Sequence, residues 1–247
     1  TEVDIRGLTF TEQEGRHRAE IEYLLVVAHR ESGEFFRYEQ STSMKLRPST
    51  HERLNRVWFP IMRDFELQPG DHQAKIIVRE VGTGLIGSVI HEFVVPSLEE
   101  FRVATPILTD TFGESDRGLP ANPQPLARRE FPQGERLLCQ LEVFGAEKGD
   151  GGMPQVIHGY RVFTPDGRLL TSHPESEILP TSLGALSRTF GFSLEDATPG
   201  EYLMVMTVRD QVSGKKLDIR EPFTVIPRVL PQPVEPAGAE ARATPSS

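Results

Sequence analysis

The sequence contains a single cysteine, Cys139, among 247 residues. One thiol excludes an intrachain disulfide framework and any cysteine-based metal site. Cys139 lies in the run LLCQLEVF and is in step, at period two, with Leu137, Leu141 and Val143. This spacing predicts a buried strand in which Cys139 serves as a small hydrophobic residue, because a reactive thiol needs exposure and a cationic neighbour.

Long apolar runs and an excess of positive charge are also missing. The longest purely apolar stretch, Leu24–Ala28, is far shorter than the roughly 18 to 20 residues of a membrane-spanning helix. Lys and Arg total 27 against 36 Asp and Glu, for a net charge of −9, and Arg128-Arg129 is followed at once by Glu130. Nucleic-acid binding requires a clustered basic surface. We therefore expect no transmembrane segment in this chain and no nucleic-acid partner.

Catalytic and cofactor motifs are absent as well. The sequence has no G-x-S-x-G elbow, no H-E-x-x-H pair and no phosphate-binding P-loop. Acid pairs such as Glu99-Glu100 and Glu175 with Glu177 are more simply explained as exposed loop charge than as a glycosidase couple. Seven histidines lack any spacing that would place two rings on one metal ion: His17, His29, His51, His72, His91, His158 and His173. We predict no catalytic residue, no metal site and no cofactor.

Calcium is the metal that the acidic loops would best tolerate. Its ligands would be Glu147 and Asp150 in AEKGDGGMP, or Asp116 in FGESDRG. Neither segment has the alternating carboxylates of a high-affinity calcium loop. Exposed loop charge remains the preferred interpretation of both.

An internal repeat organises what is present. The stretch PGDHQAKIIVRE, at Pro69–Glu80, aligns without gaps with PGEYLMVMTVRD, at Pro199–Asp210. The alignment continues downstream, and both copies close on a proline. Each copy predicts a Pro-Gly turn, a strand, and a hairpin at Gly82-Thr83-Gly84 or at Ser213-Gly214. The terminal Arg-Glu and Arg-Asp pairs are expected to be strand ends that meet solvent.

Period-two alternation assigns the faces of these strands. Tyr202, Met204, Met206 and Val208 are expected to point into one core, and Ala74, Ile76 and Val78 into another. Tyr202, two residues after its Pro-Gly turn, has the position of the tyrosine corner of Greek-key sandwiches. His72 occupies the equivalent position in the first copy and is interpreted as a residue of the fold.

The rest of the chain consists mainly of short strands separated by turns, which is typical of an all-β fold. A short helix is expected to open near Ser49-Thr50-His51-Glu52, and Pro180–Leu186 forms a similar crossing. The prediction is two tandem antiparallel β-sandwiches of the Ig-like or fibronectin III-like type, at residues 1–98 and 99–228. The Pro- and Ala-rich residues 229–247 are expected to form a disordered or extended tail.

The repeat, once laid out, resembles a known bacterial family. Its motif resembles the sequence motif that recurs after the von Willebrand factor A-like domain in VWFA-related proteins of Acidobacteria type. The matching residues here are Pro69-Gly70, Val78-Arg79-Glu80, Gly87-Ser88 and Val95-Pro96. The likeness covers most of Val3–Pro227. It implies an exported protein of the periplasm, cell surface or extracellular space with Ig-like modules. The A domain and its D-x-S-x-S motif are absent from this sequence, so metal-dependent binding is not implied.

These observations favour a non-catalytic structural or protein-interaction module, with a protein partner or self-assembly. The alternative is a module that binds a carbohydrate or another surface ligand through the loops Gly145–Pro154 and Phe112–Pro125. Those loops hold only two aromatic residues, Phe112 and Phe144 at their edge, which makes a poor sugar platform. An enzyme would need convergent carboxylates or histidines that the sequence does not indicate.

Overall fold

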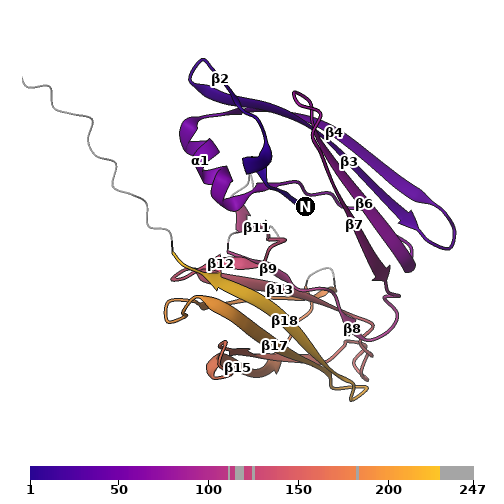
Figure 1. The fold of residues 1–247 in the computed structure, drawn as a ribbon. Coiled ribbons are helices and arrows are strands. Elements are labelled where there is room, and N and C mark those ends of the chain that lie inside the picture. Colours follow the sequence, from indigo (N-terminus) through magenta and orange to yellow (C-terminus); the bar gives the residue numbers. More distant parts are fainter. Residues whose placement is uncertain (111, 115–119, 124–125, 182–183, 229–247) are drawn as a thin grey trace, which may run out of the picture. The chain divides into compact units, whose positions relative to one another are not determined.

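The computed structural model describes residues 1–110, 112–114, 120–123, 126–181 and 184–228. The expected tail at 229–247, Asp116 and part of the loop Phe112–Pro125 lie outside these residues. The chain divides into two compact units, Thr1–Arg102 and Val103–Ser247, so the division falls four residues beyond the expected boundary. Both units are built mainly of antiparallel strands, which confirms the predicted β class (Figure 1).

Unit 1 is built on one large antiparallel sheet. Its central strand β3 (Arg16–His29) pairs with β4 (Phe35–Leu46) on one side and with β6 (Gly70–Glu80) on the other. β7 (Ile86–Val95) pairs with β6 and ends the row, as Figure 1 shows, while the short β2 (Thr11–Gln13) extends the β6 side of β3.

A small second layer covers the inner face of that sheet. It holds a two-stranded pair and two helices: β1 (Glu2–Val3), η1 (Ile5–Gly7), α1 (Pro48–Val57) and β5 (Phe59–Pro60). The helix begins one residue before the expected Ser49, because Pro48 suits the first helical position, and Arg47 makes no side-chain cap. Ile5 and Leu54 pack from this layer onto Ile21 and Met44 of the sheet.

Unit 2 has two facing sheets. One follows the order β12-β18-β17-β14-β15, and the other joins β13 to β16 on one side and to β8 and β9 on the other. This order, with β17 and β14 adjacent and flanked by β18 and β15 in one sheet and β13 beside β16 in the other, is that of Ig-like sandwiches. The strands are β8 (Arg102–Val103), β9 (Ile107–Thr109), β12 (Glu130–Pro132), β13 (Arg136–Phe144), β14 (Val156–Phe163), β15 (Leu169–Glu177), β16 (Leu186–Ser193), β17 (Gly200–Asp210) and β18 (Lys216–Ile226). β10 (Phe112–Glu114) and β11 (Pro120–Pro123) form a separate two-stranded pair that is not hydrogen-bonded into either sheet.

The repeat corresponds to a pair of matching hairpins. β6 and β17 have the same length and the same place in their sheets, and each is followed by an antiparallel return strand, β7 or β18. Their turns place Gly84 and Gly214 at φ of 73° and 74°, a region that favours glycine. The alternating faces are as expected, since Met204, Met206 and Val208 are fully buried.

The tyrosine corner is confirmed. The Tyr202 hydroxyl donates to the Thr198 carbonyl at 2.9 Å and accepts from the Thr198 N–H at 2.9 Å. In unit 1 the buried His72 ring reaches the Gly70 carbonyl through Nδ1 at 3.0 Å. Each ring therefore pins the chain that enters its own hairpin strand.

The acidic residues that end β6 and β17 do not meet solvent, so that part of the prediction is wrong. Glu80 is 3% exposed and Asp210 is fully buried, and each carboxylate accepts hydrogen bonds both from its own hairpin turn and from a distant backbone N–H. The Asp210 carboxylate takes the N–H groups of Glu147 and Val212, both at 3.0 Å, and the Ser213 hydroxyl at 2.6 Å. Burial alone would raise the pKa of Asp210, but these hydrogen bonds outweigh it and hold that pKa below its ordinary value.

Cys139 is fully buried, as predicted, and its burial raises the pKa of the thiol to about 12. This places it among inert structural cysteines rather than reactive ones. None of the helices in the described ranges is long and apolar enough to cross a membrane.

Candidate interaction surface

The edge strand β7 has an unpaired backbone side. The Glu80 N–H donates to the Leu85 carbonyl at 2.8 Å, which fixes Leu85 as a residue whose backbone groups face β6. Backbone groups alternate along an antiparallel strand. The N–H and C=O groups of Ile86, Ser88, Ile90, Glu92 and Val94 therefore point away from β6. Within the described residues no strand pairs with that side.

Apolar side chains cover both faces of β7. Ile86, Ile90 and Val94 lie on the outer face and are 60 to 66% exposed. Val89 lies on the inner face, opposite Ile76, and is 55% exposed. Large aliphatic side chains that remain this exposed on both faces of one strand favour an interaction site over a solvated edge.

A groove runs beside Val89 on the inner face. Its volume is about 310 Å³, and it lies between β6, β7 and the N-terminal segment of unit 1. Apolar side chains dominate its lining: Val3, Leu8, Ile76, Val78, Leu85 and Val89. Of these side chains, Leu85 and Val89 remain 59% and 55% exposed, so the inner face is open at the β7 end.

The hairpin that presents β7 is held firmly. The Glu80 carboxylate accepts from the Thr9 N–H at 2.5 Å through Oε1 and from the Thr83 hydroxyl through Oε2. Thr9 belongs to the N-terminal segment and Thr83 to the turn, so one buried carboxylate fixes both against the end of β6. The start of β7 is therefore preorganised.

Other edges in the described residues carry devices that discourage pairing. β4 has Arg37, Glu39 and Lys45 along its length. β15 contains Pro174, and its pairing with β14 is interrupted by register shifts. β12 has only three residues and ends in a proline. Charges, prolines, irregular register and short length are the usual protections of an edge strand. β7 has ten residues, with Glu92 as its one charged side chain.

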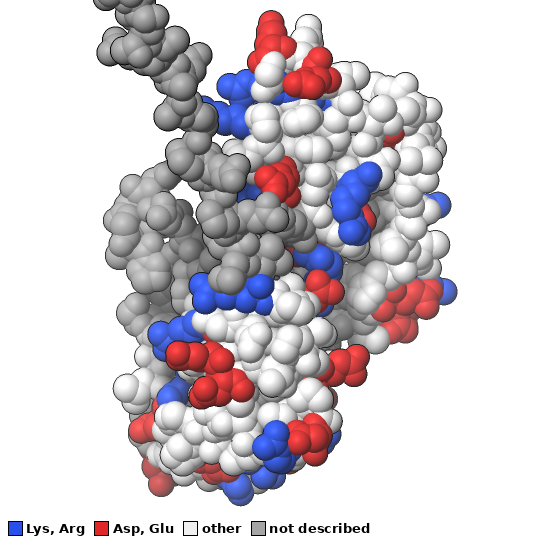
Figure 2. All heavy atoms as spheres, turned by 60° about the vertical axis from the view of Figure 1, so that its left-hand side comes forward, with Lys and Arg blue, Asp and Glu red and all other residues white. Residues whose placement is uncertain are grey.

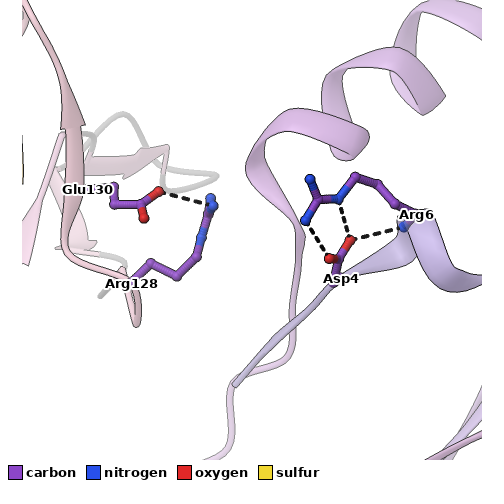
Figure 3. Close-up of polar contacts among 4 residues, drawn as sticks. All are labelled: Asp4, Arg6, Arg128 and Glu130. Carbon is purple, nitrogen blue, oxygen red and sulfur yellow. Dashed lines mark hydrogen bonds and ion pairs between the residues drawn. The ribbon is translucent and has the colours of Figure 1, made fainter. Parts of the chain in front are cut away.

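Two short-range ion pairs illustrate the charged surface. Asp4 Oδ2 accepts from Arg6 Nη2 at 2.6 Å, and Asp4 Oδ1 caps η1 by accepting from the Arg6 N–H at 3.0 Å (Figure 3). Arg128 pairs with Glu130 at 3.1 Å (Figure 3). Figure 2 shows positive and negative side chains interspersed over the visible face, with large uncharged areas between them. On this face the described residues form no large patch of one charge sign.

A second surface feature is a groove of about 860 Å³ on the outer face of the large sheet of unit 2. Arg161 and Arg220 stand on either side of Val205, since Val205 pairs with both positions. Both arginines are exposed, and neither has a hydrogen bond or ion pair with another described residue. Apolar walls are supplied by Phe163, Leu203 and Pro222.

Among the described residues, no group of three His, Cys, Asp or Glu side chains could hold a metal ion, although some of the histidines considered from the sequence meet in pairs. His17 and His51 stack at 4.3 Å between ring centroids, beside Phe10. Burial and the charge of His17 lower the pKa of His51. Glu175 pairs with Arg209 at 3.3 Å, and the N–H of Glu147 caps Asp210.

The residues that sequence reasoning missed are those of β7. Its run IGSVIHEFVV predicts a strand, but an apolar run is normally the sign of burial. Two features of the sequence could have revealed the edge. β7 carries almost no charge, and no further strand that could pair with it follows before unit 1 ends.

Comparisons with known proteins place the chain in no family. No family model matches the sequence, and no curated protein matches it either. Among solved structures, the fold is similar to part of the crystal structure of dimeric latent PorU from Porphyromonas gingivalis, with 13% sequence identity and a TM-score of 0.35. That similarity covers 92% of this chain and 18% of the PorU chain, so this chain spans less than a fifth of that protein's length. None of these comparisons links the chain to VWFA-related proteins.

Proposed function

We propose that this protein is a non-catalytic interaction module that binds a protein partner by adding a strand to the β7 edge of unit 1. The observation that carries the proposal is the exposed edge itself: a strand of ten residues in which the backbone groups of every second residue point away from β6, with apolar side chains on both faces. In strand addition, main-chain hydrogen bonds supply affinity and alternate side-chain pockets supply specificity. The groove beside Val89 is suited to receive side chains of the added strand.

The setting is part of the same proposal. The resemblance of Pro69-Gly70 and Val78-Arg79-Glu80 to the modules of bacterial VWFA-related proteins favours the cell envelope or the extracellular space. In that setting, unit 1 would provide the binding edge and unit 2 would act as a spacer or structural module.

The test uses a variant that removes one outward N–H and leaves the β6–β7 hydrogen bonds in place. Ile90→Pro does this, because the Ile90 N–H points away from β6. The full chain, wild type or variant, is immobilised and exposed to bacterial envelope extract, and captured proteins are quantified by mass spectrometry. Leu169→Lys is the matched control, since Leu169 is a comparably exposed aliphatic residue of unit 2.

We expect wild type and Leu169→Lys to capture the same proteins and Ile90→Pro to capture them at least tenfold less. Circular dichroism of Ile90→Pro should match wild type. Equal capture by Ile90→Pro would rule out strand addition at β7.

A second function is favoured by the groove of unit 2, where Arg161 and Arg220 are exposed and form no ion pair within 4 Å with another described residue. We propose that this groove is an alternative site for an anionic surface ligand, in which the two guanidinium groups bind carboxylates and Phe163 packs against a sugar ring. Oligogalacturonate is a suitable probe. Calorimetry should detect saturable binding that weakens at least tenfold in Arg161→Gln/Arg220→Gln, and no heat of binding at millimolar probe would contradict the idea.

A further inference from the structure

The sequence of β7 is self-complementary about Ile90. We propose that the partner strand at this edge is β7 of a second copy of the chain, paired antiparallel about a two-fold axis at Ile90. The inference rests on the strand-addition function proposed above and specifies its partner. It follows from three properties of the described strand: its backbone parity, its side-chain pairing and its charge.

Backbone parity allows this register. A two-fold axis at Ile90 places Ile90 opposite its own copy, Ile86 opposite the second copy's Val94, and Ser88 opposite the second copy's Glu92. All of these residues have outward N–H and C=O groups, by the alternation that the Glu80–Leu85 hydrogen bond fixes. Every outward group from Ile86 to Val94 then finds a partner. The two sheets of unit 1 would join into one continuous sheet with both inner faces on the same side.

Side-chain pairing selects this register over its neighbours. On the outer face it sets aliphatic against aliphatic, with Ile86 against Val94 and Ile90 against Ile90, and Ser88 beside Glu92 as a hydroxyl donor. On the inner face it sets Gly87 against the ring of Phe93, and Val89 against His91.

A shift of the axis by one residue breaks these pairings. Centred on His91, the register places Ile90 opposite Glu92 and His91 opposite itself. Centred on Val89, it places Glu92 opposite Ile86. Both set the Glu92 carboxylate beside an isoleucine and so lose the aliphatic pairs of the outer face.

Charge does not oppose association in the Ile90 register. Glu92 is the one charged side chain of β7, and Arg30 already neutralises it with a 2.6 Å ion pair. The two copies of Glu92 would stand four residues apart along the paired strands, about 14 Å at roughly 3.4 Å per residue. An isologous pair of this kind closes on itself and does not propagate into a fibre through this edge.

Site-directed cross-linking tests the register. In the full chain, Ile90→Cys should form a disulfide-linked dimer on mild oxidation, because directly opposed residues of an antiparallel pair lie within the reach of a disulfide. Ser88→Cys alone and Glu92→Cys alone should not, whereas a mixture of the two should form a mixed dimer. The wild-type chain is the blank, since its one thiol, Cys139, is fully buried.

Sedimentation equilibrium tests the association itself. The wild-type chain and Leu169→Lys should dimerise with the same dissociation constant. Ile90→Lys places two ammonium groups opposite each other and should raise that constant at least a hundredfold, while circular dichroism stays unchanged because Ile90 is 60% exposed in one copy.

The possible results separate this inference from the function on which it rests. A wild-type chain that remains monomeric at the highest accessible concentration, with no Ile90→Cys cross-link, overturns the second copy as the partner. If envelope proteins other than the chain itself are then still captured in an Ile90-dependent way, strand addition stands. If capture is also indifferent to Ile90, both proposals fail.

Discussion

The two units contain the same hairpin but finish it differently. In unit 2, the return strand β18 is covered along part of its free side by β12, and Phe131 of β12 is fully buried. In unit 1, no described strand lies beside the return strand β7, and its aliphatic residues remain exposed. The two copies of the hairpin therefore differ in whether a described strand covers the return strand, and the proposed function rests on this difference.

The buried strand ends show the same contrast on a smaller scale. The Asp210 carboxylate accepts three hydrogen bonds within unit 2. The Glu80 carboxylate accepts two, one of them from the N–H of Thr9 near the N-terminus. Both carboxylates hold a hairpin. Only the one in unit 1 holds a hairpin that presents an open edge.

The largest effect is expected where unit 2 is made to resemble unit 1. Phe131→Ala removes the side chain that β12 inserts into the core and should cost about 3 to 5 kcal/mol of the unfolding free energy of unit 2. Amide hydrogen exchange of β17 and β18, followed by mass spectrometry, measures this loss. Unit 1 should be unaffected, and the fluorescence of Trp58, the only tryptophan, reports on it separately. A loss in both units would mean that they unfold together.

The next effect compares the two carboxylates. Asp210→Ala leaves the N–H groups of Glu147 and Val212 without their acceptor and should destabilise unit 2 by about 3 kcal/mol. Glu80→Ala should destabilise unit 1 by about 2 kcal/mol, because it leaves the Thr9 N–H and the Thr83 hydroxyl without their acceptor. Urea unfolding followed by Trp58 fluorescence measures the second, and hydrogen exchange of β17 the first. A negligible effect of either variant would mean that water replaces the carboxylate.

The sequence predicts the hairpins well because their determinants are local. The Pro-Gly turns, the glycines at positive φ and the period-two faces of β6 and β17 all lie within a dozen residues of one another. The burial of Glu80 and Asp210 could not be predicted in this way, since their partners Thr9 and Glu147 are 71 and 63 residues distant.

The candidate surface at β7 could not be predicted from the sequence for a related reason. An apolar run such as IGSVIHEFVV predicts a strand, but whether another strand covers it depends on topology. In unit 2, the covering strand comes from residues 130–132, far upstream of β18. Composition alone does not show that β7 has no equivalent neighbour among the described residues.

A third contrast between the units is the expected dependence of their stability on pH. His158 pairs with Val208 in unit 2 at the position that Tyr23 takes opposite Val78 in unit 1. Burial, followed by the nearby charges of Arg188 and His173, lowers the pKa of His158 to about 4. Between pH 6.5 and about 4, His158 is protonated in the unfolded chain but neutral in the folded unit. Unit 2 therefore loses stability as the pH falls through this range.

His158→Phe should abolish that loss, which we expect to reach roughly 2 kcal/mol at pH 4.5. The new ring can pack in the aromatic cluster that His158 shares with Phe190 and Tyr160. Hydrogen exchange of β17 at pH 7 and pH 4.5 makes the comparison, at a pH still above the range in which Asp210 takes up a proton. An undiminished loss in His158→Phe would assign the acid sensitivity to another group.

The smallest effect sharpens the comparison between the two rings that pin the crossovers. Tyr202→Phe removes a hydroxyl that both donates to and accepts from Thr198, and it should cost unit 2 about 1 kcal/mol. His72→Phe removes a single contact to the Gly70 carbonyl and should cost unit 1 less, because that carbonyl lies near the surface where water can reach it. Hydrogen exchange of β17 and Trp58-detected urea unfolding give the two values. A larger loss of unfolding free energy in His72→Phe than in Tyr202→Phe would mean that the imidazole makes a further stabilising interaction. The T-shaped contact of His72 with His29, at 4.8 Å between ring centroids, would then be tested next.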